Sequence, residues 1–125
     1  MKKVLLIDKD ISQGNILADA IRHSSREIII VHSVQEAVSL FKREPIDLIL
    51  LDIVPEADAA ATVEGVRKGV EDVLKRKVPL IVLAKSFSES AYLLERADVD
   101  VLLEVSAHAD QLNQIVEQFI GCTVI

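Results

Sequence analysis

A fivefold alternation between short aliphatic runs and segments of helical spacing is the feature that most constrains the fold of this chain. The runs lack the apolar–polar alternation of half-exposed strands, and continuous runs of this kind are typical of strands buried on both faces. They lie at Val4–Ile7, Ile28–Val31, Ile46–Leu51, Leu80–Leu83 and Val99–Leu103. Since 50% of the residues are hydrophobic but only 3% are aromatic, the core must be built from Val, Ile, Leu and Ala.

Helical periodicity follows each aliphatic run. Apolar residues three and four positions apart form one stripe per segment, and each stripe buries one side of a helix. The five stripes are Ile16, Leu17, Ala20 and Ile21; Val34, Ala37, Val38 and Phe41; Val63, Val66, Val70, Val73 and Leu74; Ala91, Leu94 and Ala97; and Leu112, Ile115, Val116, Phe119 and Ile120. This repeated β–α order predicts a three-layer, doubly wound α/β fold with a five-stranded parallel sheet and helices on both faces. We expect a single domain over residues 1–125.

The formal net charge of −6 argues against direct binding to nucleic acid, which requires a basic face. Basic residues do cluster at 67–68 and 75–77, but acids are interspersed among them, which favours a solvated helix face. No apolar run approaches the roughly 20 residues of a membrane helix, and the first run is too short for a signal peptide. A single cysteine, Cys122, fits a reducing compartment. We therefore expect a cytoplasmic protein that binds neither nucleic acid nor membranes.

Two of the first three aliphatic runs lead into an aspartate. Val4–Ile7 is followed by Asp8 and Leu48–Leu51 by Asp52, while Asp10 follows in the first loop. Ligands of open α/β sheets bind outside the carboxyl ends of the strands, and the first and third strands are expected to be neighbours, so these carboxylates should converge. Carboxylates at one edge repel unless a cation lies among them, an arrangement that suits Mg²⁺. A carboxylate can also be a nucleophile toward a phosphoryl group.

Three motifs of the chain resemble the receiver domains of response regulators (CheY-like domains). Leu5–Asp10, Asp47–Asp52 with Pro55 soon after it, and Val78–Leu83 are similar to the first, third and fourth strands of that family. The similarity extends over the whole chain with little gapping, and the third-strand motif is its most specific part. The resemblance implies a flavodoxin-like sheet with the strand order 2-1-3-4-5.

When the family's site residues are assigned by position, the resemblance implies that Asp52 is the phosphoacceptor and Asp8 the first acidic residue of the metal site. Both would then hold Mg²⁺. The family's second acidic position falls on Lys9, and Asp10 would supply the missing carboxylate if the loop shifts. A Lys9 ammonium beside Asp8 and Asp52 would instead satisfy them by a charge-assisted bond and disfavour Mg²⁺ by repulsion. For Asp10, capping of the first helix is the alternative role.

Further departures from the family lie at the ends of the fourth and fifth strands. The family places Thr or Ser where this chain has Ala84, and it places Lys where the segment 103–106 reads Leu-Glu-Val-Ser. Without the hydroxyl, one phosphoryl oxygen would lose a donor, and without the lysine a second oxygen would lose a salt bridge. Ala84 and Glu104 are therefore interpreted as degenerate switch positions. Lys85 is a candidate substitute cation.

Three functions stay open from the sequence. In the first, a sensor histidine kinase or a phosphotransfer protein of a phosphorelay donates a phosphoryl group to Asp52. The face made by the fourth helix, the fifth strand and the fifth helix then binds a downstream effector protein or a second copy as a homodimer. The second is a phosphorylation-independent pseudo-receiver that acts as a protein-interaction module. The third is an enzyme or cofactor binder, but the turn 8–14 has one glycine and no phosphate-binding loop, so we expect no enzyme. His23, His32 and His108 share no partner spacing and are interpreted as surface or helix-end residues.

Overall fold

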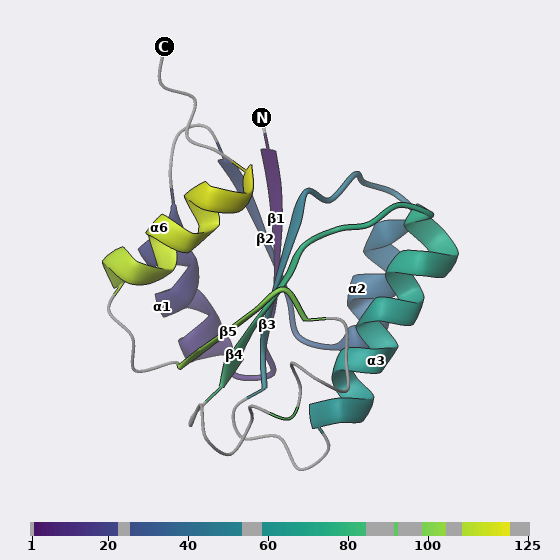
Figure 1. Cartoon of the computed structure of the whole chain (residues 1–125), viewed down its shortest axis with the longest axis horizontal. Helices are drawn as coiled ribbons and strands as arrows, with labels where there is room; N and C mark the ends of the chain where they lie inside the picture. Colours follow the sequence, from purple (N-terminus) through teal and green to yellow (C-terminus); the bar gives the residue numbers. More distant parts are fainter. Residues whose placement is uncertain are drawn as a thin grey trace.

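The computed structural model of the chain describes residues 2–22, 26–53, 59–84, 92, 99–104 and 109–120. Its centre is a five-stranded parallel sheet in the order β2-β1-β3-β4-β5 (Figure 1). The strands are β1 (Lys2–Ile7), β2 (Arg26–Val31), β3 (Leu48–Asp52), β4 (Leu80–Ala84) and β5 (Val101–Glu104). The predicted fold class and strand order are confirmed, and no strand end differs from its predicted position by more than two residues.

Helices cover both faces of the sheet (Figure 1). The α1 helix (Ile11–Ile21) and the α6 helix (Ala109–Ile120) pack together on one face. The α2 helix (Val34–Phe41) and the α3 helix (Ala59–Gly69) pack together on the other. At its end α3 continues into a π-helical turn, η1 (Val70–Leu74). None of the helices in the described ranges is long and apolar enough to cross a membrane.

Some residues named from the sequence lie outside the described part of the chain. They include Pro55, Lys85 and Cys122, and also the fourth helical stripe at 91–97 apart from Tyr92. The side chain of Tyr92 is exposed. The fourth helix of the predicted partner face therefore lies outside the described residues. The other two elements of that face are described as β5 and as α6, which is the predicted fifth helix.

The hydrophobic core has two halves, one on each face of the sheet, because successive side chains of a strand point to opposite faces. Leu5 and Ile7 of β1 pack with α2 and α3, whereas Val4 and Leu6 pack with α1 and α6. Every residue of β3 and β4 is buried. Burial on both faces explains why the runs of β3 and β4 show no apolar–polar alternation, whereas the edge strands β2 and β5 are only partly buried.

The buried face of α1 differs from the predicted stripe. Its buried residues are Gly14, Leu17, Ala18 and Ile21. Ile16, which the stripe placed in the core, is exposed, so that part of the prediction is wrong. The helix lies close to the end of β1 at Gly14, where an added Cβ would be 3.4 Å from the Cβ of Asp8. Apolar periodicity could not reveal this contact, because glycine contributes no apolar side chain.

Ser33 caps the amino-terminal end of α2, and Glu36 follows three residues later, which is the spacing of a capping box. Its Oγ accepts a hydrogen bond from the backbone N–H of Glu36 at 3.1 Å. In a standard capping box the Glu36 carboxylate would accept the backbone N–H of Ser33. Here its Oε2 instead accepts the backbone N–H of His32 at 3.0 Å. The first turn of α2 is thereby joined to the segment that follows β2.

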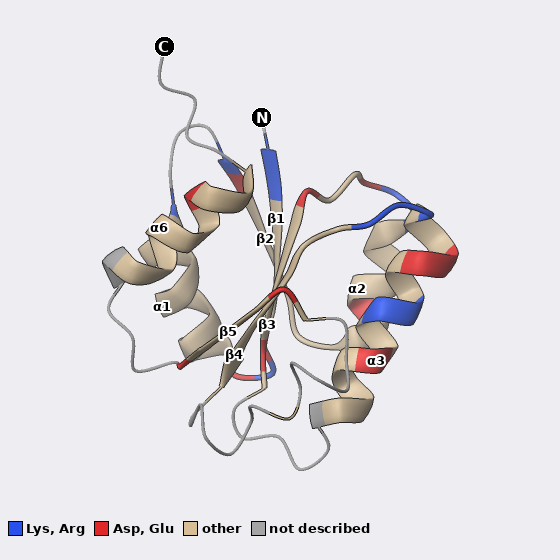
Figure 2. Ribbon diagram, viewed as in Figure 1, with Lys and Arg blue, Asp and Glu red and all other residues tan. Residues whose placement is uncertain are grey.

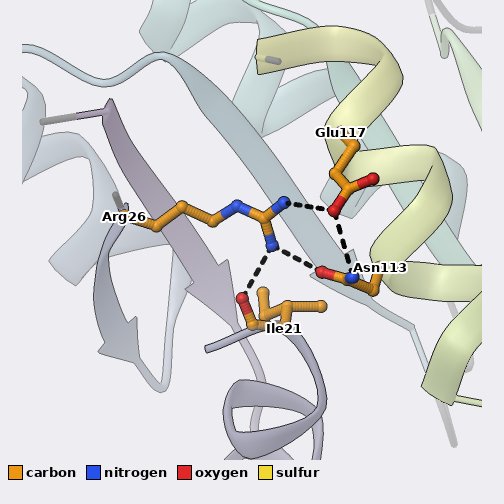
Figure 3. A network of polar contacts seen from close by, with 4 residues as sticks. All are labelled: Ile21, Arg26, Asn113 and Glu117. Carbon is orange, nitrogen blue, oxygen red and sulfur yellow. Dashed lines mark hydrogen bonds and ion pairs between the residues drawn. The ribbon is translucent and has the colours of Figure 1, made fainter. Parts of the chain in front are cut away.

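A buried arginine joins three elements at the amino-terminal end of β2 (Figure 3). The side chain of Arg26 is only 1% exposed. Its Nη1 donates to the carbonyl oxygen of Ile21 at 2.8 Å and to Oδ1 of Asn113 at 2.7 Å. Its Nη2 lies 3.7 Å from Oε1 of Glu117, which also accepts a hydrogen bond from Nδ2 of Asn113 at 3.3 Å. The network fixes α6 against the end of α1.

Two glycines of α3 provide a matched test of helix packing. A Cβ at Gly69 would lie 2.8 Å from Cγ2 of Val38 and 3.4 Å from Cε2 of Phe41, whereas one at Gly65 would lie 3.6 Å from Cγ1 of Val34. We expect Gly69→Ala to lower the free energy of unfolding by about 1 kcal/mol, because overpacking outweighs the gain in helix propensity. Gly65→Ala should raise it by about 0.5–1 kcal/mol, because it gains propensity without a clash.

Urea unfolding of both glycine variants, followed by circular dichroism, measures this difference. Equal changes of the same sign would show that the close contact between α2 and α3 at Gly69 does not limit side-chain size.

Candidate functional site

Asp8 and Asp52 come together at the carboxyl-terminal edge of the sheet. Ile7 pairs with Leu51 in the β1–β3 register, so the next residue on each strand is an aspartate. Their side chains therefore point to the same face of the sheet, the one that α1 covers. Asp8 is 1% exposed and Asp52 is 4% exposed. Figure 2 shows acidic residues at this end of β3. The structure thus brings the two carboxylates together as the strand-end pattern predicts.

The hydrogen-bonding groups of Asp8 are fixed at three points. Its backbone N–H donates to the carbonyl oxygen of Val31 at 3.0 Å, and its own carbonyl oxygen lies 2.9 Å from Nδ1 of His32. Its Oδ1 accepts the backbone N–H of Asp10 at 2.9 Å. Among the described residues, no donor reaches Oδ2 of Asp8, which is buried. A buried carboxylate oxygen without a donor is costly, so this atom favours a cation beside it.

Asp10 and Lys9 occupy the loop between β1 and α1, and both are exposed. Oδ1 of Asp10 accepts the backbone N–H of Gln13 at 3.0 Å and so caps α1, which was the alternative role expected for it. Lys9 donates no hydrogen bond to Oδ2 of Asp8. The expectation that Lys9 lies beside the carboxylates of Asp8 and Asp52 stays a prediction. Ligation of a metal by Asp10 stays a prediction.

The two degenerate switch positions lie opposite each other at the ends of β4 and β5. Asp52 pairs with Leu83, and the next residue of β4, Ala84, pairs with Glu104 of β5. Ala84 is fully buried, and Glu104 is exposed. Lys85, the candidate substitute cation, falls outside the described residues. At these two positions the described edge has the methyl group of Ala84 on β4 and the carboxylate of Glu104 on β5, where the family resemblance predicts a hydroxyl and a cation.

The edge fits Mg²⁺ through two carboxylates. Within the described ranges, no group of three or more His, Cys, Asp or Glu side chains is arranged to hold a metal ion. Mg²⁺ does not need such a group, because it commonly takes one or two protein carboxylates and keeps several waters. Oδ2 of Asp8 is the buried atom that such a cation would satisfy. Asp8 and Asp52 are accordingly the residues that could hold it.

A separate pocket of about 590 Å³ lies at the other end of the sheet. Its lining residues are Arg67, Val70, Glu71, Lys75, Arg76 and Lys77. Arg67 donates to the carbonyl oxygen of Val78 at 2.6 Å and to Oδ2 of Asp100 at 2.8 Å, while Arg76 donates to the carbonyl oxygen of Ile46. The expectation of a solvated face is thus wrong for Arg67, which is largely buried. Both arginines hold the segments that enter β3 and β4, so the pocket is not part of the aspartate edge.

Several solved structures share this fold over nearly the whole chain. A response regulator from Thermotoga maritima matches with a TM-score of 0.79 at 17% identity, covering 98% of this chain and 99% of that one. The receiver domain of a sensor histidine kinase from Pseudomonas aeruginosa, which has a magnesium ion in its active-site cleft, matches with a TM-score of 0.76 at 20% identity, covering 97% and 98%. A CheY-like receiver domain from Methanospirillum hungatei matches with a TM-score of 0.72 at 20% identity, covering 96% and 94%. No family model and no curated protein matches the sequence.

The strand order and the aspartate edge define a doubly wound, flavodoxin-like α/β protein. Within that class, the chain has the fold of the response-regulator receiver (CheY-like) domains. At 17–20% identity this likeness concerns the fold, and the function has to be argued from the site.

Sequence reasoning missed His32. It was interpreted as a surface or helix-end residue, yet its imidazole is bonded to the backbone of Asp8. Its partner is a carbonyl oxygen, a group that every residue carries, so no sequence pattern could have indicated the pair. His23 and His108 lie outside the described residues.

Proposed function

We propose that this chain is a phosphoryl-accepting receiver module of two-component signalling, with Asp52 as the phosphoacceptor. The observation that carries the proposal is the pair of buried aspartates, Asp8 and Asp52, at the ends of adjacent central strands. The receiver fold supports it, as does the magnesium ion in the cleft of the Pseudomonas aeruginosa domain. A cytoplasmic location is part of the proposal.

Asp52 would act as the nucleophile. One of its carboxylate oxygens attacks the phosphorus of a phosphohistidine on a sensor histidine kinase or a phosphotransfer protein. A P–O bond forms while the P–N bond breaks, and the imidazole leaves with the electron pair. Mg²⁺, held by Asp8 and Asp52, would supply positive charge to the transferring oxygens. Asp8 serves this chemistry by keeping its buried Oδ2 oriented without a competing hydrogen bond from the described residues.

The residues at Ala84 and Glu104 would make the phosphorylated state less stable than in a receiver with both partner groups. Ala84 cannot donate a hydrogen bond to a phosphoryl oxygen, and Glu104 adds negative charge where a cation would help. We therefore expect slow phosphorylation. The signal would pass through β5 and α6 to a downstream effector protein or to a second copy of the chain as a homodimer.

Incubation with acetyl phosphate and Mg²⁺, followed by intact-mass measurement, tests the proposal. We expect the wild-type protein to gain one phosphoryl group and Asp52→Asn to gain none, because the amide is not a nucleophile toward phosphorus. Removal of Mg²⁺ with EDTA should abolish the gain. A folded wild-type protein that stays unmodified, or an Asp52→Asn variant modified to the same extent, would refute the assignment.

A pseudo-receiver is the second candidate function, and Ala84 with Glu104 is the observation that favours it. In that case the fold would act as a protein-interaction module with constitutive binding. Absence of phosphorylation in a folded protein, together with partner binding that Asp52→Asn leaves unchanged, would support this candidate over the first.

A further inference from the structure

His32, the first residue after β2, contacts the backbone of Asp8, the first residue after β1. Its Nδ1 lies 2.9 Å from the carbonyl oxygen of Asp8. Because a carbonyl oxygen can only accept a hydrogen bond, Nδ1 must carry the proton in this contact. The bond spans the ends of β1 and β2, just beyond the last pair of the ladder, Ile7 with Val31.

The backbone of His32 is itself held by the first turn of α2. Its N–H donates to Oε2 of Glu36 at 3.0 Å, and the N–H of Glu36 donates to Oγ of Ser33 at 3.1 Å. The imidazole therefore starts from a fixed backbone, and its hydrogen bond to Asp8 loses little freedom on forming.

The contacts continue from Asp8 into α1. Oδ1 of Asp8 accepts the N–H of Asp10, whose Oδ1 in turn accepts the N–H of Gln13 at 3.0 Å. His32 thus completes a chain of hydrogen bonds from α2 to α1 that passes through Asp8. Within the described part, this chain and the bond to Val31 engage every hydrogen-bonding group of Asp8 except Oδ2.

We propose that His32 is a positioning residue for Asp8, which fixes the carbonyl of Asp8 and thereby the direction in which Oδ2 faces a cation. The inference rests on the proposed function, because it concerns the same aspartate edge. Groups that hydrogen-bond a metal ligand from outside orient it, and their loss commonly costs about 10–100-fold in metal affinity. The imidazole acts through Asp8 and touches neither the metal nor the phosphoryl group.

Three variants at position 32 separate the Nδ1 hydrogen bond from simple packing. In His32→Asn the amide nitrogen occupies the place of Nδ1, whereas His32→Gln puts its amide one bond further out and His32→Leu has no donor. We expect His32→Leu and His32→Gln to weaken Mg²⁺ binding about tenfold, and His32→Asn to stay within about twofold of the wild type. Amide NMR shifts during Mg²⁺ titration give the affinity. The rate of phosphorylation by acetyl phosphate should recover at saturating Mg²⁺.

Gly69→Ala is the control for stability, because it overpacks α3 against Val38 and Phe41 and touches no residue of the hydrogen-bond chain through His32 and Asp8. It should lower the unfolding midpoint without changing Mg²⁺ affinity. A Gly69→Ala variant that weakens Mg²⁺ binding as much as His32→Leu would overturn the inference, since the effect would then follow stability.

The outcomes also distinguish this inference from the proposed function. If the wild type binds Mg²⁺ and is phosphorylated but all three variants match it, the role of His32 is refuted and the receiver function stands. If His32→Asn fails to restore the affinity lost in His32→Leu, the Nδ1 hydrogen bond is not the cause and the inference is likewise refuted. If the wild type binds Mg²⁺ without being phosphorylated, the receiver function fails while the affinities still test His32. A wild type that does not bind Mg²⁺ refutes both.

Discussion

Arg26→Ala is expected to lower the free energy of unfolding by about 3 kcal/mol. The substitution removes the donor to two acceptors, the carbonyl oxygen of Ile21 and Oδ1 of Asn113, and a buried polar group left unsatisfied costs about 1–3 kcal/mol. Since the arginine side chain is 1% exposed, its truncation also leaves a cavity. Loss of the ion pair with Glu117 adds less, because that carboxylate is 36% exposed and stays hydrated.

Arg22→Ala is the matched control for this loss. Arg22 lies near Arg26 in the sequence, but its ion pair with Asp19 joins two largely exposed side chains 3.5 Å apart. Its removal should change the free energy of unfolding by less than about 0.5 kcal/mol. Arg26→Lys should fall between the two, because an ammonium keeps the charge but lacks the planar fork. Urea unfolding measures all three, and equal stability of Arg26→Ala and Arg22→Ala would show that the network does not hold α6 in place.

Arg26 is an example of a buried residue that local sequence patterns do not predict. The aliphatic run predicts a second strand from Ile28, yet β2 begins at Arg26. Because the strand prediction depends on apolar residues, a charged residue such as Arg26 is assigned to the preceding loop. It is buried here because its partner Asn113 lies 87 residues away in the sequence. The alternation of strands and helices could be predicted because each element carries its own periodicity, whereas partners supplied by a distant helix leave no local signal.

One part of the candidate site could be predicted from the sequence, and another part could not. Asp8 and Asp52 could be predicted to meet, because each follows a buried strand and parallel strands end at one edge. The geometry that holds Asp8 could not, because it depends on the backbone of α1 and on the imidazole of His32. For Lys9, sequence position alone suggests a cation beside the two carboxylates; it donates no hydrogen bond to Oδ2 of Asp8, and its role toward Asp52 stays a prediction.

Glu104→Lys is expected to raise the rate of phosphorylation of Asp52 by acetyl phosphate about tenfold. Glu104 ends β5, two strands from β3, and neighbouring strands lie about 4.8 Å apart, so the two carboxylates are on the order of 10 Å apart. At that distance the Coulomb energy between two unit charges is about 0.4 kcal/mol in water and about 1.7 kcal/mol near a protein surface. The substitution changes the charge by two units, and because Glu104 is exposed the effect should fall toward the lower end of this range.

Glu71→Lys is the control for Glu104→Lys, because it makes the same change in net charge at an exposed residue of η1, beside the pocket at the other end of the sheet. It should leave the rate unchanged, and Glu104→Gln, which removes one unit of charge, should raise it about threefold. The gain for Glu104→Lys should shrink as salt rises from 0.01 to 0.15 M, since the screening length falls from about 30 Å to about 8 Å. An equal gain in Glu71→Lys would assign the effect to net charge and donor attraction. A gain confined to position 104 would show that the acidic end of β5, rather than the lost hydroxyl at Ala84 alone, limits the reaction at Asp52.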